Sequence, residues 1–185
     1  TAVFEDFPGE LLVLSAGEPM WRGGLSGPGS LFLHQDRPLI SENGTSTLMH
    51  ELLHLAQGYR ADDDADWIVE GLAEFYSIEF MRRSGSLPPE QATRAFERLR
   101  EWGHDVDSLR TDRSTGAVTA RAATLFADLD REVSRATAGE ASLDDVARGL
   151  TAHGGPVGLA TLRQVAEQIT GAPSAVLAND RVPGY

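Results

Sequence analysis

Residues 50–54 read His50-Glu51-Leu52-Leu53-His54, and the interpretation of the whole chain starts from them. Two histidines four residues apart on a helix lie only about 40° apart around its axis, so both imidazoles can reach one metal ion. Glu51 would then lie beside the metal, where it can take a proton from a bound water. The stretch predicts a helix with two metal ligands and a general base.

A third ligand is expected from the next segment. Glu70 comes sixteen residues after His54, in an apolar run where an unpaired carboxylate would be costly. Two histidines and a carboxylate form a typical catalytic zinc site with an open fourth position. The H-E-x-x-H pattern is short enough to occur by chance, but its helical periodicity and the helix that follows favour a metal site.

Glu74 lies one helical turn after Glu70 and should share its face. Metal-bound histidines usually donate their other ring N–H to a carboxylate or carbonyl, so we expect Glu74 to accept from His50. The alternatives are an exposed helix glutamate, or Glu74 as the metal ligand in place of Glu70.

Composition excludes several classes of function. The chain has 185 residues, 41% of them hydrophobic, which suits one soluble domain with a real core. A net charge of -12 argues against nucleic-acid binding, and no apolar run approaches the roughly 18 residues of a membrane span. Without cysteine, a metal must be held by His, Asp and Glu.

The chain opens at Thr1, so a processed form or an excised domain is expected. The location of the protein is left open, with the periplasm or extracellular space favoured.

The pattern predicts a single α+β domain in three parts: a β-rich part at residues 1–40, a helical part at residues 45–171 and a tail at residues 172–185. Short strands separated by Gly, Pro and Ser are expected at residues 11–15, 19–24 and 30–34. They should form a small antiparallel sheet, with a flexible glycine-rich turn at residues 23–29.

About six helices should follow the sheet. Apolar periodicity and capping signals place them at residues 45–58, 66–83, 89–102 and 117–135, from Ser142 onward, and at residues 159–170. The fourth helix should bury Ala123, Phe126, Leu129 and Val133. The loop at residues 60–66 holds four aspartates and is expected to be a charged surface turn, with an auxiliary calcium site as the alternative.

These motifs resemble a known group of enzymes. Residues 50–54, followed by the run Glu70-Gly71-Leu72-Ala73-Glu74-Phe75-Tyr76, look like the gluzincin metallopeptidases, especially the glycyl aminopeptidase family and its leukotriene-hydrolase-like relatives. Softer similarity continues through residues 121–130 and 142–146, and covers roughly residues 20–183 in all. The resemblance implies a thermolysin-like zincin catalytic domain, without the family's N-terminal β domain or accessory domains.

The resemblance also implies residue roles. One zinc ion would be bound by His50, His54 and Glu70, and Glu51 would be the general base of peptide-bond hydrolysis. The family's oxyanion-binding tyrosine is missing, because Thr119 stands at its position and Ala122 at that of a nearby glycine. An oxyanion donor is worth about 10²–10³ in rate, so a substitute is needed. Candidate substitutes are Arg121, Tyr59, Tyr76, His104 and His153; core packing is the alternative for Tyr76, and a helix-end histidine for His104.

A second departure lies in the glycine-rich turn. The aminopeptidase relatives carry a Gly-Gly-x-Glu edge strand whose glutamate binds the substrate's α-amine, whereas Gly23-Gly24-Leu25 is followed here by Ser26. We expect Gly24, Leu25 and Ser26 to contact a peptide or protein substrate that is not recognised as by a standard aminopeptidase. The alternative is a plain hairpin turn.

The sequence thus predicts a zinc-dependent peptidase whose oligomeric state is open. One rival is a catalytically impaired zinc-binding relative, which the missing tyrosine supports and the intact Glu51 opposes. The other, outside the enzymes, is an interaction module that holds a peptide without cutting it.

Overall fold

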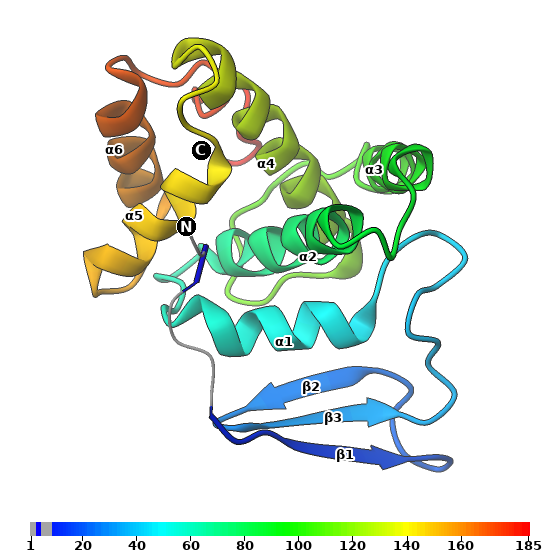
Figure 1. Cartoon of the computed structure of the whole chain (residues 1–185). Coiled ribbons are helices and arrows are strands. Elements are labelled where there is room, and N and C mark those ends of the chain that lie inside the picture. Colours follow the sequence, from blue (N-terminus) through cyan, green and yellow to red (C-terminus); the bar gives the residue numbers. More distant parts are fainter. Residues whose placement is uncertain (1–2, 5–8) are drawn as a thin grey trace.

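The computed structural model describes residues 3–4 and 9–185, and within them the chain forms an α+β fold with a small sheet and six helices (Figure 1). The strands are β1 (Leu12–Ala16), β2 (Gly24–Gly27) and β3 (Ser30–His34). The helices are α1 (Thr47–Gln57), α2 (Asp66–Arg83), α3 (Pro89–Trp102), α4 (Gly116–Ala136), α5 (Leu143–His153) and α6 (Leu159–Thr170). In this part of the chain, no helix combines the length and apolarity that crossing a bilayer would need.

The sheet is mixed, so the prediction of an antiparallel sheet was wrong for one of its two pairings. Its strand order is β1-β3-β2, with β2 antiparallel and β1 parallel to β3. Phe32 at the centre pairs with Leu14 on one side and Leu25 on the other. Alternation of apolar residues marks a strand but carries no information on its direction, which depends on how the connection between β1 and β2 crosses the sheet.

The second strand was also misplaced. Residues 19–24 were predicted as a strand and residues 23–29 as a turn, but β2 lies within that turn and reverses into β3 around Gly29, whose φ is 63°. Gly24 explains the error. A Cβ at this position would lie 2.6 Å from Thr47 Cγ2 and 2.7 Å from Glu51 Cγ. The glycine therefore permits close packing of β2 on α1 and does not signal flexibility.

The predicted helices are confirmed to within about two residues at each end. α1 begins where Ser46 Oγ accepts from the backbone N–H of Met49, at 3.2 Å, and ends at Gly58 in the left-handed conformation. The capping box expected at Ser142 is present at the start of α5.

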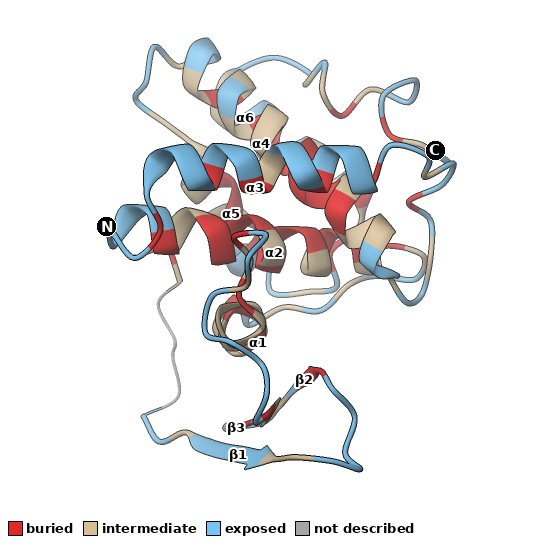
Figure 2. Ribbon diagram, turned by 90° about the vertical axis from the view of Figure 1, so that its right-hand side faces the viewer, coloured by how far each residue is buried: buried red, intermediate tan, exposed pale blue. Residues whose placement is uncertain are grey.

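The elements stack in layers. The sheet lies under α1, and α1 lies under α2; α3 and α4 pack on other sides of α2, and α5 and α6 pack on α4 and on each other (Figure 1). α2 is the most buried helix, whereas β1 and the outer face of α3 are exposed (Figure 2). Gly71 lets α2 approach α4 closely, since a Cβ there would lie 2.5 Å from the Cβ of Ala122. The predicted stripe on α4 is buried as expected.

The C-terminal segment packs more firmly than its weak periodicity suggested. Leu177 and Val182 are buried, and the hydroxyl of Tyr185 donates to the carbonyl of Asp64 at 3.0 Å. The aspartate loop is tied down as well, because Asp64 also pairs with Arg110 at 2.7 Å. Among the described residues, no three acidic or histidine side chains of this loop lie close enough together to hold a metal ion. The alternative prediction of a calcium site in the loop therefore gains no support.

Candidate metal centre

The two histidines of α1 converge as their spacing predicts. His50 and His54 project from one face of the helix, and their Nε2 atoms lie 3.1 Å apart. The ring planes are nearly perpendicular, at 81°. Both nitrogens therefore face a common point beside the helix.

α2 brings the third predicted ligand to the same point. Glu70 Oε2 lies 3.1 Å from His50 Nε2, and Glu70 Oε1 lies 3.3 Å from His54 Nε2. The three side chains offer donor atoms that all lie within 4.8 Å of one another. They come from two helices, so packing of α1 on α2 builds the cluster.

The spacing of these donor atoms is compatible with zinc. Ligand atoms about 2.05 Å from a zinc ion at tetrahedral angles are separated by about 3.3 Å. His50 Nε2 lies 3.1 Å from both His54 Nε2 and Glu70 Oε2, and His54 Nε2 lies 3.3 Å from the other carboxylate oxygen, Glu70 Oε1. Between 15% and 29% of the surface of each side chain is exposed, so solvent can reach the cluster. A catalytic site with an open position requires such access.

Glu74 makes the contact predicted for it. Its Oε2 lies 2.9 Å from His50 Nδ1, so the Nδ1–H of His50 donates to Glu74 and Nε2 is turned toward Glu70 and His54. The carboxylates also change the acidity of the ring. Burial lowers the pKa of His50, but the hydrogen bonds and charges of Glu70 and Glu74 outweigh it and raise that pKa to about 10.

The same contacts act on Glu70 in the opposite direction. Burial raises the pKa of its carboxyl, but the hydrogen bonds and charges of His50 and His54 outweigh this and hold the pKa well below its usual range. The cluster is thus an anionic pocket that favours a proton or a metal cation.

Glu51 lies between α1 and the sheet. It is 8% exposed, and its Oε1 approaches β2 so closely that a Cβ on Gly24 would lie 3.0 Å from it. The strand order leaves the outer edge of β2 unpaired in the described sheet. Gly24, Leu25 and Ser26 therefore form a free strand edge next to the predicted general base.

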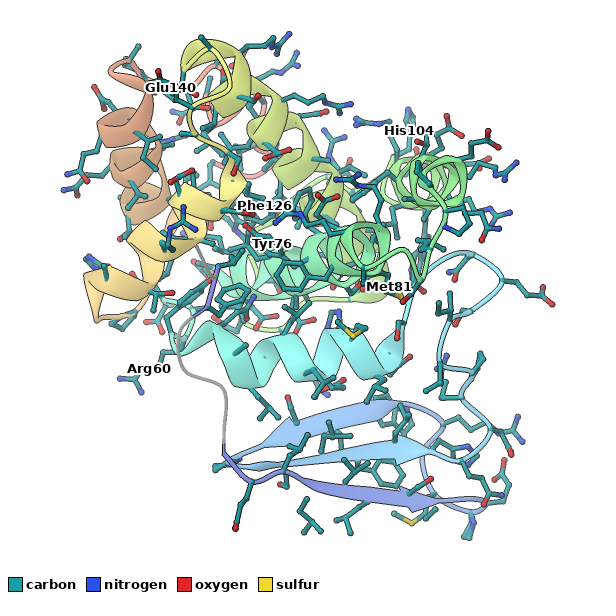
Figure 3. All side chains as sticks on the ribbon, in the orientation of Figure 1. Arg60, Tyr76, Met81, His104, Phe126 and Glu140 are labelled. Carbon is teal, nitrogen blue, oxygen red and sulfur yellow. The ribbon has the colours of Figure 1, made fainter. Side chains whose placement is uncertain are left out.

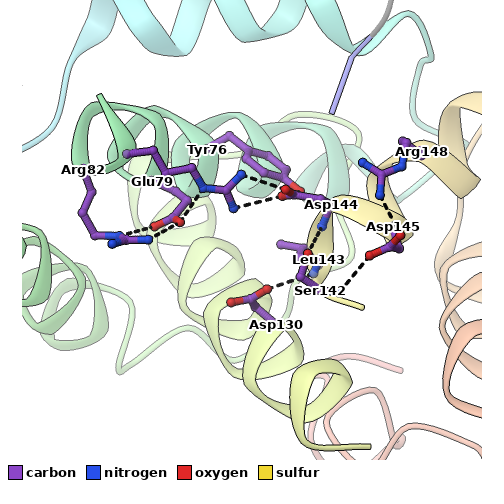
Figure 4. Close-up of polar contacts among 10 residues, drawn as sticks. Tyr76, Glu79, Arg82, Asp130, Ser142, Leu143, Asp144, Asp145 and Arg148 are labelled. Carbon is purple, nitrogen blue, oxygen red and sulfur yellow. Dashed lines mark hydrogen bonds and ion pairs between the residues drawn. The ribbon is translucent and has the colours of Figure 1, made fainter. Parts of the chain in front are cut away.

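Tyr76 has a structural role and does not reach the cluster. It is fully buried, and its hydroxyl donates to Asp144 Oδ1 at 3.2 Å, as Figure 4 shows. Arg83 binds the same carboxylate. Tyr59 has a buried hydroxyl for which no partner was found in the described part of the chain. Burial raises the pKa of both phenols, and the charge and hydrogen bond of Asp144 raise that of Tyr76 further.

The remaining oxyanion candidates lie elsewhere. His104 is 81% exposed at the end of α3 and contacts Asp105 (Figure 3). His153 is exposed at the end of α5, and Arg121 lines a cavity beside the C-terminal segment. No contact among the described residues joins any of the five candidates to the cluster. They were chosen as side chains able to donate a hydrogen bond, and residue type does not tell which side chains reach the cluster.

Sequence reasoning missed Gln57. It lies one turn after His54 and is fully buried, and its Nε2 donates to the carbonyl of Val69 at 3.1 Å. This bond joins α1 to α2 at the residue before Glu70 and so helps to fix the spacing of the ligands. The available signal was a polar residue on the face of α1 that carries both histidines.

His34 was also missed. It is 1% exposed at the end of β3, its Nδ1 accepts from the backbone N–H of Asp36 at 3.2 Å, and its Nε2 has no partner within the described residues.

In comparisons with known proteins, no family model, no curated protein and no solved structure matches the chain.

Proposed function

We propose that this chain is a zinc-dependent peptidase with a thermolysin-like gluzincin catalytic domain, related to the glycyl aminopeptidase family. The observation that carries the proposal is the convergence of His50, His54 and Glu70, whose donor atoms lie within 4.8 Å of one another, with both carboxylate oxygens 3.1 to 3.3 Å from a histidine Nε2. That donor set suits zinc, and the open side suits a catalytic site.

The residues divide the chemistry between them. Zinc, when bound by His50, His54 and Glu70, supplies a Lewis acid that activates water and polarises a carbonyl. Glu51 takes the proton of the attacking water and passes it to the leaving amine. Glu74 holds His50 in the tautomer that ligates, through the 2.9 Å contact.

The substrate proposed is an extended peptide. The free edge of β2 offers backbone N–H and C=O groups that can pair with such a chain next to Glu51. Ser26 replaces the carboxylate that would bind a free α-amine, which supports cleavage within a chain over removal of single N-terminal residues.

A second candidate is a catalytically impaired relative that binds zinc and peptides as a binding module. It is favoured by the absence, among the described contacts, of a link between the cluster and any of the five oxyanion candidates. A missing donor would slow the reaction about 10²–10³-fold.

The test combines metal analysis with peptide turnover. The purified chain is expected to bind one zinc ion and to cleave a quenched fluorescent peptide library, with activity lost to a chelator. Glu51→Gln should retain zinc but lose about 10²–10⁴-fold in rate, whereas Glu97→Gln, on the outer face of α3, should match the wild type. Full activity in Glu51→Gln, or failure to bind zinc, refutes the proposal. Zinc and peptide binding without turnover would support the binding module.

A further inference from the structure

A polar cavity of about 310 Å³ lies apart from the metal ligands, between α4, Arg100 of α3 and the C-terminal segment. In Figure 1 this segment runs beside α4 on the side away from the sheet. Three arginines line the cavity: Arg100, Arg121 and Arg181. Its volume is at the lower end of the range for small-molecule sites.

Two of these arginines have no internal partner. Arg100 is bound by Asp128 at 3.0 Å, and Asp128 also binds Arg131. In the described structure, neither the Arg121 nor the Arg181 guanidinium takes part in a hydrogen bond or an ion pair. The chain carries 28 acidic residues and a net charge of -12. Two guanidinium groups without an ion pair beside one cavity therefore contrast with the negative charge of the chain as a whole.

The backbone that carries both arginines is held rigidly. A Cβ on Gly103 would lie 2.6 Å from the backbone nitrogen of Arg121, so the end of α3 packs directly on α4 at this residue. The C-terminal segment is fixed by Glu132, whose carboxylate accepts from the backbone N–H groups of residues 175 and 176. Val182, next to Arg181, is fully buried. The backbone positions from which the two side chains start are therefore fixed, which limits the freedom lost when they bind a ligand.

We propose that Arg121 and Arg181 bind a small oxyanion in this cavity, through a carboxylate or a phosphate group. A guanidinium donates two parallel N–H groups, which match two oxygens of either group. Asp180 also lines the cavity and competes with the ligand by repulsion. The site therefore selects a compact anion that can bridge both arginines.

Binding is tested on the full chain by calorimetry and by amide chemical shifts, with inorganic phosphate as one probe and succinate as the other. The protein is stripped of metal with a chelator and then dialysed free of it, so that neither probe acts through a metal and the chelator's carboxylates do not compete. Binding of phosphate alone assigns a phosphate site, and binding of succinate alone or of both assigns a carboxylate-accepting one. The shifted amides should belong to α4 and the C-terminal segment.

Variants decide whether the arginines are responsible. Arg121→Gln and Arg181→Gln should each weaken binding roughly tenfold or more, and Asp180→Asn should strengthen it. Arg94→Gln is the matched control, since it makes the same change in net charge at an exposed position of α3 outside the cavity. Circular dichroism checks that each variant is folded. The proposal is overturned if neither probe binds the wild type, or if both cavity arginine variants bind as Arg94→Gln does.

Discussion

Replacing Glu74 should weaken zinc binding without removing a zinc ligand. Glu74 is 13% exposed, so its carboxylate is little screened by water where it meets His50 Nδ1 at 2.9 Å. Loss of such a partner typically costs roughly 10- to 100-fold in metal affinity, or about 1.4–2.7 kcal/mol. Glu74→Gln keeps an acceptor oxygen and should lie near the lower figure, while Glu74→Ala should lie near the upper one.

The assay is competition for zinc against a chromophoric chelator of known affinity. Glu79→Gln is the matched control, because Glu79 lies on the same helix with the same 13% exposure but pairs with Arg82 and Arg83. It should bind zinc like the wild type even if it unfolds at a lower temperature. If Glu74→Ala matches the wild type in zinc affinity, the 2.9 Å contact does not support the metal site and the reasoning fails.

Three further outcomes are expected. Glu70 and Glu74 raise the pKa of His50 to about 10, so zinc uptake near neutral pH should release about one proton from this ring, measured by calorimetry in buffers of different ionisation enthalpy. Below that pKa, apparent zinc affinity should rise with pH. Zinc uptake without proton release would contradict a charged His50 ring. Gly71→Ala should lower the free energy of unfolding by about 1–3 kcal/mol in urea melts, because the added methyl meets α4. Tyr185→Phe should cost about 1–2 kcal/mol in the same assay, since the buried Trp67 indole N–H loses its acceptor and the carbonyl of Asp64 loses one of its two donors; wild-type stability in either variant would count against the contact.

The helices and the cluster of His50, His54 and Glu70 were predictable because their signals are local. Ser46 and Gly58 mark the ends of α1 by hydrogen bonding and by backbone conformation, and both act within a few residues of sequence. The four-residue spacing of His50 and His54 fixes their common face in any α-helix. Glu70 was identified because a carboxylate in an apolar helix needs a partner.

What failed depends on contacts between distant segments. The parallel pairing of β1 with β3 and the close approach of Gly24 to Glu51 arise from how the chain crosses the sheet, and no local pattern encodes them. The anchoring of Tyr185 by Asp64 joins residues far apart in sequence. Tyr76 was offered as a possible oxyanion donor with core packing as the alternative, and its burial agrees with the alternative; the partner that engages its hydroxyl, Asp144, lies on another helix.

The charges of the cluster argue that a divalent cation, more than a proton, is what it accommodates. Glu70 and Glu74 place two carboxylates against two imidazoles on two packed helices. The raised pKa of His50 shows that one proton is attracted there, but a single proton balances only one of these carboxylates. A divalent cation held by His50, His54 and Glu70 would balance both. The Glu51 carboxylate makes no hydrogen bond among the described contacts, which is consistent with the proposal that it accepts a proton from water.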